Sequence, residues 1–227
     1  MIHILATGTS RGIGAAIMSA LDRPGVRIAG HGTASGIAAD LSDPAAPARL
    51  WEAALEQLGA IDVLINNAGI YEANPIDRDE SDWNAAWERT MRINLTAAAA
   101  LSRLAVRHWR ARRQGGRIIN IASRAAHRGD SADHWDYAAS KAGMVAMTKT
   151  IARHYAAEEI LAFAICPGFV DTDMAADHLG PALLDEIPLG RVAMPGEGAE
   201  MARWLALDAP ASMTGAVLDV NGASYVR

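Results

Sequence analysis

The chain has 227 residues, of which 51% are hydrophobic, so it is long enough for one α/β domain with a substantial core. A formal net charge of -5 argues against a nucleic-acid partner. No apolar run approaches the roughly 18 residues of a membrane helix, and the chain enters a strand pattern at once, so we expect neither membrane contact nor a targeting segment. One cysteine, Cys166, excludes an internal disulfide and a multi-cysteine zinc site. We therefore expect no metal and a reducing, cytoplasmic setting.

A short strand, a glycine-rich turn and a helix open the chain. Residues 2–6 have the apolar pattern of a buried strand, and small apolar residues recur at helical spacing behind the turn. Glycines at this place let the backbone approach a pyrophosphate, and the helix start offers N–H groups and a positive dipole end. The alternative is an ordinary turn, because the spacing is Gly-x-x-x-Gly-x-Gly and not the Gly-x-Gly-x-x-Gly of the long dehydrogenases. The residues predicted to hold the phosphates are Gly8, Ser10, Arg11, Gly12, Ile13 and Gly14.

The end of the second predicted strand, residues 26–29, indicates which dinucleotide is bound. An acidic side chain near this point bonds the ribose 2′-hydroxyl in sites that prefer NAD, and none stands here. Arg11 lies in the glycine turn and His31 at the strand end, and a guanidinium suits a 2′-phosphate by charge and geometry. The sequence therefore predicts NADP(H), with NAD(H) as the alternative. In that alternative Arg11 is a solvated turn residue.

The connection to the third predicted strand, residues 37–41, is unusually short. Only about five residues separate it from the second strand, whereas a parallel crossover needs roughly a dozen. We predict that no helix lies between His31 and Ala38, which leaves the adenine side more open. The remaining elements are predicted as helices over 43–59, from 137 onwards and 196–207, as one or two helices over 81–113, and as strands over 61–65, 117–122, 161–166 and 216–220.

A tyrosine and a lysine four residues apart provide the candidate catalytic pair. Tyr137 and Lys141 share one face if they lie on a helix, and an ammonium beside a phenol lowers the pKa of the phenol from about 10. A tyrosine so tuned can act as an acid or base near neutral pH. Ser123, at the end of a predicted strand just upstream, completes the arrangement.

These motifs, together with Asn66-Asn67-Ala68-Gly69 and Asn94, resemble the short-chain dehydrogenase/reductase family, and most closely its 3-oxoacyl-carrier-protein reductase-like members. The resemblance implies a single doubly wound parallel Rossmann sheet of six to seven strands over residues 1–227. Residues 1–110 would form mainly the coenzyme-binding half, and 111–227 the catalytic half with a lid near 173–190. It implies the catalytic residues Asn94, Ser123, Tyr137 and Lys141. It adds to the coenzyme-binding set His31, Asp40, Leu41, Asn67, Ala68, Gly69, Tyr137, Lys141, Pro167, Gly168, Val170 and Thr172.

The activity implied is reversible hydride transfer between NADP(H) and a small carbonyl compound or secondary alcohol. A homotetramer or homodimer is implied by the resemblance alone. Residues 124–136 lie between the catalytic serine and tyrosine, and their polarity favours a polar or acidic substrate unless they are simply a solvated loop. Two alternatives remain: a non-catalytic dinucleotide-binding sensor or scaffold, and a cofactor-free lyase of similar fold. Such a lyase carries arginine at the position of Lys141, so the lysine in this chain argues against the lyase alternative.

Overall fold

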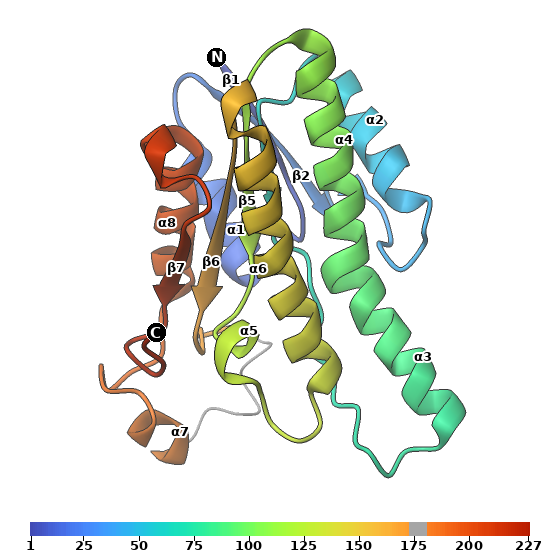
Figure 1. The fold of residues 1–227 in the computed structure, drawn as a ribbon, viewed down its shortest axis with the longest axis vertical. Helices are drawn as coiled ribbons and strands as arrows, with labels where there is room; N and C mark the ends of the chain where they lie inside the picture. The colour runs from blue at the N-terminus through green and yellow to red at the C-terminus, as the bar shows by residue number, and fades with distance from the viewer. Residues whose placement is uncertain (173–180) are drawn as a thin grey trace.

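The computed structural model describes residues 1–172 and 181–227 and contains one seven-stranded parallel sheet in the order β3-β2-β1-β4-β5-β6-β7 (Figure 1). The central strands are continuous apolar runs, as is typical of strands that are covered on both faces. The order reverses between β1 and β4, so a crevice opens there at the carboxyl ends of the strands. The strands are β1 (Ile2–Ala6), β2 (Val26–Gly32), β3 (Ile37–Ala38), β4 (Val63–Asn66), β5 (Gly116–Ile121), β6 (Ile160–Pro167) and β7 (Val217–Val220).

Helices cover both faces of the sheet. One core cluster packs α1 and α8 against the sheet, and another packs α2 and α4 against its opposite face beside α6 (Figure 1). The doubly wound fold expected from the sequence is therefore confirmed. The helices are α1 (Gly12–Leu21), α2 (Ala46–Leu58), α3 (Glu80–Met91), α4 (Ala97–Arg112), α5 (Ala125–Arg128), α6 (Trp135–Tyr155), α7 (Pro181–Asp185) and α8 (Pro195–Leu207).

The short connection between β2 and β3 contains no helix, as predicted. The chain reverses at Gly36, whose φ of +62° is a conformation that other residues rarely adopt. A β-carbon there would lie 2.2 Å from the carbonyl oxygen of Gly30, so only glycine fits. Two residue pairs then join β3 to β2, which makes β3 a minimal edge strand.

The long helical stretch after Glu80 is broken by one turn of π-helix, Arg92–Thr96, between α3 and α4. The region 81–113, predicted as one or two helices, contains two that are joined at a π-bulge, a feature that bends helices and is frequent at functional sites. Asn94 lies within this turn and is fully buried.

The helix predicted over 43–59 begins later than expected. Helix α2 begins at Ala46 and not at Asp43, and Pro47 lies in its first turn. The Asp43 carboxylate accepts a hydrogen bond from the Ala45 N–H at 2.9 Å, so it closes a turn ahead of the helix. Of the predicted lid, residues 173–180 lie outside the described residues, and α7 begins directly after them.

No helix in the described parts of the chain is both long enough and apolar enough to cross a membrane.

Candidate active site

A cleft of about 590 Å³ runs along the carboxyl ends of β1, β2, β4, β5 and β6. This volume lies within the range of small-molecule and cofactor sites. Every residue predicted to bind the coenzyme lines the cleft, from Gly8 in the glycine turn to Thr172 after β6. Ser123, Tyr137 and Lys141 line it as well, so motifs far apart in the sequence meet in one cavity. Asn94 does not line the cleft and is buried behind the residues that do.

The glycine turn has no room for side chains. Gly8 has a φ of +67°, and a β-carbon on it would lie 2.7 Å from the Cα of Ala68. A β-carbon on Gly14 would lie 1.9 Å from the Gly8 carbonyl oxygen. The Asn67 amide donates to the carbonyl oxygens of Thr7 and Gly8, at 3.1 and 2.8 Å, and so fixes the turn to the end of β4. Asn67 thus ties the ends of two neighbouring strands, β1 and β4, together.

The start of α1 fits a pyrophosphate. No side chain caps this helix, and its first turn contains no acidic residue, so the N–H groups at its start have no competing side-chain partner. Those groups and the dipole end face the cleft lined by Gly12 and Ile13. Arg11 directly precedes the helix and is exposed. The residues present therefore suit the diphosphate group of a dinucleotide.

His31 lines the cleft, but its ring is already fully bonded. Its Nδ1 accepts the Gly8 N–H at 3.3 Å, and its Nε2 donates to the Ala39 carbonyl oxygen at 3.0 Å. The residue is 3% exposed, and this burial lowers the pKa of His31 below its usual value of 6.5. Because Nδ1 accepts a hydrogen bond, the ring is neutral and offers no charge to a phosphate. His31 therefore lines the cleft as a support beneath the glycine turn, and Arg11 remains the residue expected at a 2′-phosphate.

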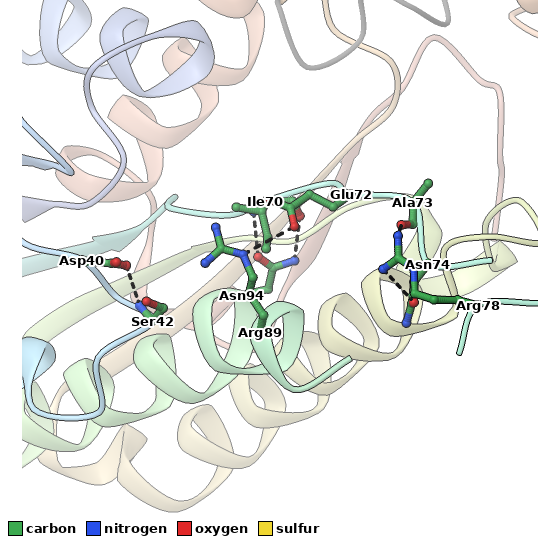
Figure 2. A network of polar contacts seen from close by, with 9 residues as sticks. All are labelled: Asp40, Ser42, Ile70, Glu72, Ala73, Asn74, Arg78, Arg89 and Asn94. Atoms are coloured by element: carbon green, nitrogen blue, oxygen red, sulfur yellow. Dashed lines mark hydrogen bonds and ion pairs between the residues drawn. The ribbon is translucent and has the colours of Figure 1, made fainter. Parts of the chain in front are cut away.

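Asp40 and Leu41, which follow the short connection after β2, line the cleft. Leu41 is buried, whereas the Asp40 carboxylate is exposed and accepts the Ser42 N–H at 2.9 Å, which lowers the pKa of Asp40 (Figure 2). Arg89 of α3 lines the same part of the cleft and pairs with Glu72 at 3.4 Å. Nothing in the sequence had pointed to Arg89.

Tyr137 and Lys141 lie on one face of α6, and Ser123 follows β5. The Lys141 ammonium donates to the Ile121 carbonyl oxygen at 2.9 Å and lies 5.7 Å from the centre of the Tyr137 ring. Burial raises the pKa of Tyr137 to about 12, although a hydrogen bond with Ser123 opposes this shift. Burial also lowers the pKa of Lys141 to about 8. The expected lowering of the tyrosine pKa is thus wrong for this structure, because burial of the Tyr137 ring outweighs its hydrogen bond with Ser123.

Asn94 bonds Ile70 in the loop after β4 (Figure 2) and joins this loop to α6 through Ser140. Its Oδ1 accepts the Ile70 N–H at 2.8 Å, and its Nδ2 donates to the Ile70 carbonyl oxygen at 3.0 Å and to Ser140 Oγ at 3.3 Å. All its polar atoms are therefore used by protein groups. Asn94 positions the segment that carries Gly69 beside Lys141, since a β-carbon on Gly69 would lie 3.4 Å from Lys141 Nζ.

Changing Lys141 to methionine should alter how stability depends on pH. The folded-state pKa of Lys141, about 8, lies below its ordinary 10.5, so between these values the unfolded chain binds more protons. The free energy of unfolding of the wild type should therefore rise by about 2 kcal/mol relative to Lys141→Met between about pH 7.5 and 9.5. Chemical denaturation at both pH values measures this difference. If the free energies of unfolding of the two proteins changed equally with pH, burial would not disfavour the charged form of Lys141.

Two further groups include residues that were not found from the sequence. Asn66, a member of the asparagine motif, donates to Asn120 Oδ1 at 2.8 Å, and Asn120 donates to Thr148 Oγ1 at 2.8 Å, so the two residues that the sequence did not indicate, Asn120 and Thr148, extend the tie from β4 to β5 and α6 beneath the cleft. In the cleft itself, the Tyr71 ring packs edge-on against Tyr137, with ring centres 4.8 Å apart. Neither group belongs to a repeated spacing, so no periodicity revealed it.

Cys166 is fully buried, and burial raises the pKa of its thiol to about 11. His127 lies 3.6 Å away, from Nε2 to Sγ, although the sequence showed no histidine nearby. Burial lowers the pKa of His127 too, so the pair is neutral. It provides no activated thiolate.

Comparison with known proteins supplies the deciding observation. The family model described as enoyl-(acyl carrier protein) reductase matches residues 8–223. The 3-oxoacyl-[acyl-carrier-protein] reductase FabG of Vibrio cholerae is 34% identical over 240 residues, covering 98% of this chain and 96% of that protein. The chain belongs to the short-chain dehydrogenase/reductase family. It is accordingly an oxidoreductase of that family.

Other relatives of this short-chain dehydrogenase/reductase differ in the substrates that their names give. The 3beta-hydroxysteroid dehydrogenase 1 of Eggerthella lenta is also 34% identical, over 244 residues that cover 96% of this chain and 92% of that protein. A crystal structure of 3-ketoacyl-(acyl-carrier-protein) reductase from Brucella melitensis, complexed with NADH, superposes with a TM-score of 0.88 at 26% identity, covering 99% of this chain and 98% of that one. The likeness fixes the family and the fold, while the substrate must be argued from the cleft.

Proposed function

We propose that this protein is an NADP(H)-dependent oxidoreductase that interconverts a carbonyl compound and a secondary alcohol at Ser123, Tyr137 and Lys141. The observation that carries the proposal is that these three side chains line the same cleft as the glycine turn. An acid–base group and a dinucleotide cradle in one cavity are what carbonyl reduction requires. The relatives named as reductases and as a hydroxysteroid dehydrogenase act in keeping with this chemistry.

The chain would hold the coenzyme along the whole cleft. The turn from Gly8 to Gly14 would take the diphosphate, and Asp40 with Leu41 would flank the adenine. Asn67, Ala68 and Gly69 would face a ribose, and the residues after β6 would close over the nicotinamide. When bound, NADPH supplies the hydride that reduces the carbonyl carbon. The nicotinamide end would be held by Pro167, Gly168, Val170 and Thr172, all of which line the cleft.

The protein's own residues would handle the oxygen and its proton. In the reducing direction the Tyr137 hydroxyl would give its proton to the carbonyl oxygen while Ser123 donates a hydrogen bond to that oxygen. A pKa of about 12 keeps Tyr137 protonated at neutral pH, which suits a proton donor. Lys141 would then assist reprotonation, held by Ile121 and backed by the segment that Asn94 positions.

The direct test uses NADPH that carries deuterium at the transferable position of the nicotinamide. The purified protein is incubated with a panel of ketones, and the alcohols formed are analysed by mass spectrometry. We expect loss of the near-ultraviolet absorbance of NADPH and one deuterium on the carbinol carbon of the product. Coenzyme binding without reduction of any panel member would favour the non-catalytic dinucleotide-binding alternative.

Coenzyme preference is expected to depend on Arg11. Its exposed guanidinium at the start of α1 supports NADP(H), because no acidic side chain stands at the end of β2 and His31 is neutral. Changing Arg11 to glutamine should weaken NADPH binding by about 10–100-fold, as for a lost charge-assisted hydrogen bond, and leave NADH binding nearly unchanged. Fluorescence titrations with both coenzymes measure this. Equal losses for both would assign Arg11 to the shared diphosphate instead.

We also propose that the protein works as a homo-oligomer, a tetramer or dimer, in the cytoplasm. The single cysteine supports a reducing compartment. The family resemblance supports the oligomer. Met144, Val145 and Ile151 of α6 are buried within the chain itself, so any partner would contact other residues of that helix.

A further inference from the structure

A buried arginine stands beside the proposed catalytic serine. Arg124 directly follows Ser123, and its N–H donates to the Pro167 carbonyl oxygen at 2.9 Å. The residue is 8% exposed and lines the cleft together with Tyr137 and Phe169. Its guanidinium lies over the Phe169 ring, 4.4 Å from the ring centre. The charge is therefore fixed in the catalytic end of the cleft and not on a solvated loop.

This guanidinium has no anionic partner among the residues that the structure describes. No carboxylate in the described ranges lies within ion-pair distance of it, and its Nη1 is buried without a hydrogen-bond partner there. The two acidic residues whose charges reach it are engaged elsewhere. Glu186 pairs with Arg128 at 3.6 Å, and Asp130 accepts hydrogen bonds from the Tyr71 hydroxyl and the Ser131 N–H, at 3.2 and 2.8 Å.

A buried guanidinium without an anionic partner is stabilised when an anion binds to it. Burying an unpaired charge is costly, and arginine does not escape the cost by losing its proton. Stacking on Phe169 stabilises the cation only partly and leaves the edges of the guanidinium available. A carboxylate satisfies such an edge with two parallel hydrogen bonds. Because Arg124 adjoins Ser123, the anion belongs on the molecule whose carbonyl oxygen Ser123 would hold.

We propose that the substrate is a small oxo acid, reduced to the hydroxy acid, whose carboxylate is bound by Arg124. This inference rests on the proposed reductase function and specifies its substrate class. It sets this chain apart from a reductase whose substrate presents a neutral acyl chain beside the carbonyl. Such a chain would leave the buried charge unpaired, and a site whose buried polar groups are left unpaired discriminates against that substrate.

The test compares oxo acids with their methyl esters, which share the carbonyl and differ in charge. The pairs are 2-oxobutanoate, 3-oxobutanoate and 4-oxopentanoate, each with its ester, and NADPH oxidation gives kcat/KM for every compound. For the chain length that fits, we expect the wild type to favour the acid by about 10–100-fold. Changing Arg124 to methionine, which keeps much of the apolar volume, should remove that preference while ester reduction persists.

Arg128→Met is the matched control, because Arg128 lines the same cleft but is paired with Glu186 and more exposed. It should change the acid-to-ester ratio by less than about threefold. Arg124→Lys keeps the charge without the fork and should fall between wild type and Arg124→Met. If Arg124→Met does not fold, as judged by circular dichroism, Arg124→Lys and the wild-type ratio decide.

The outcomes separate the two proposals. Reduction of esters by the wild type with no preference for any acid would overturn the anionic substrate and leave the reductase standing. An acid preference that persists in Arg124→Met would also overturn it. Reduction of neither acids nor esters would count against the reductase itself.

Discussion

Changing Tyr137 to phenylalanine is expected to lower kcat by about 10²–10⁴-fold, because the variant keeps the ring but loses the proton that the carbonyl oxygen must receive. The effect should be confined to turnover. Tyr137 lies on helix α6, whereas the glycine turn proposed to hold the diphosphate lies at the other end of the cleft. NADPH affinity, measured by fluorescence titration, should therefore stay within about tenfold of wild type, the loss of one hydrogen bond.

Tyr71→Phe provides the control for this experiment. Tyr71 packs against Tyr137 in the same cleft, and its hydroxyl donates to Asp130 rather than to the proposed reaction centre. Loss of that hydroxyl should reduce kcat by less than about tenfold. If Tyr71→Phe and Tyr137→Phe were equally impaired, the proton donor would not be Tyr137 alone. Near-normal turnover by Tyr137→Phe would refute the assignment outright.

Changing Gly14 to alanine is expected to destabilise the fold and abolish NADPH binding together. The added β-carbon would lie 1.9 Å from the Gly8 carbonyl oxygen and 2.6 Å from the Asn67 amide nitrogen. Both contacts are far inside van der Waals distance, and the oxygen belongs to the backbone, so the glycine turn itself must move. We expect the free energy of unfolding to fall by about 3 kcal/mol or more, as for a severe overpacking change.

A second helix glycine gives the matched control. Gly196 lies in the first turn of α8, and a β-carbon there would meet nothing within 4 Å. Gly196→Ala should leave NADPH binding unchanged and shift the free energy of unfolding by no more than about 1 kcal/mol, toward greater stability. Urea denaturation and NADPH titration of both variants make the comparison. A Gly14→Ala protein that matched wild type in both measurements would show that the glycine turn can accommodate the added β-carbon.

The sequence predicts the structure where the spacing of residues along the chain alone fixes their relative positions. Tyr137 and Lys141 share a helix face because they are four residues apart, and the missing helix after His31 followed from the chain length available. The parallel sheet followed from apolar runs alternating with helical patterns. These conclusions needed only local spacing.

Properties set by tertiary surroundings were not available from spacing. The pKa of Tyr137 is raised because the folded chain buries the ring, and the motif alone suggested the opposite. The sequence places His31 at the end of a strand near the coenzyme, while its bonds to Gly8 and Ala39 appear only in three dimensions. Arg124 belongs to a segment, 124–136, that the sequence describes only as polar. Its burial beside Ser123 and its lack of an ion pair among the described residues distinguish it from Arg128, which pairs with Glu186.

The two bonds of His31 have a consequence for the coenzyme site as a whole. One neutral ring connects the turn for the diphosphate with the segment that leads to the adenine, so neither end can shift without disturbing the other. Since burial lowers the pKa of this ring, the connection persists at mildly acidic pH, where an exposed histidine would already be charged. In the unfolded chain His31 is exposed and takes up a proton at a higher pH than it does in the folded protein. As the pH falls, the free energy of unfolding therefore decreases before the hydrogen bonds of His31 in the folded site are lost.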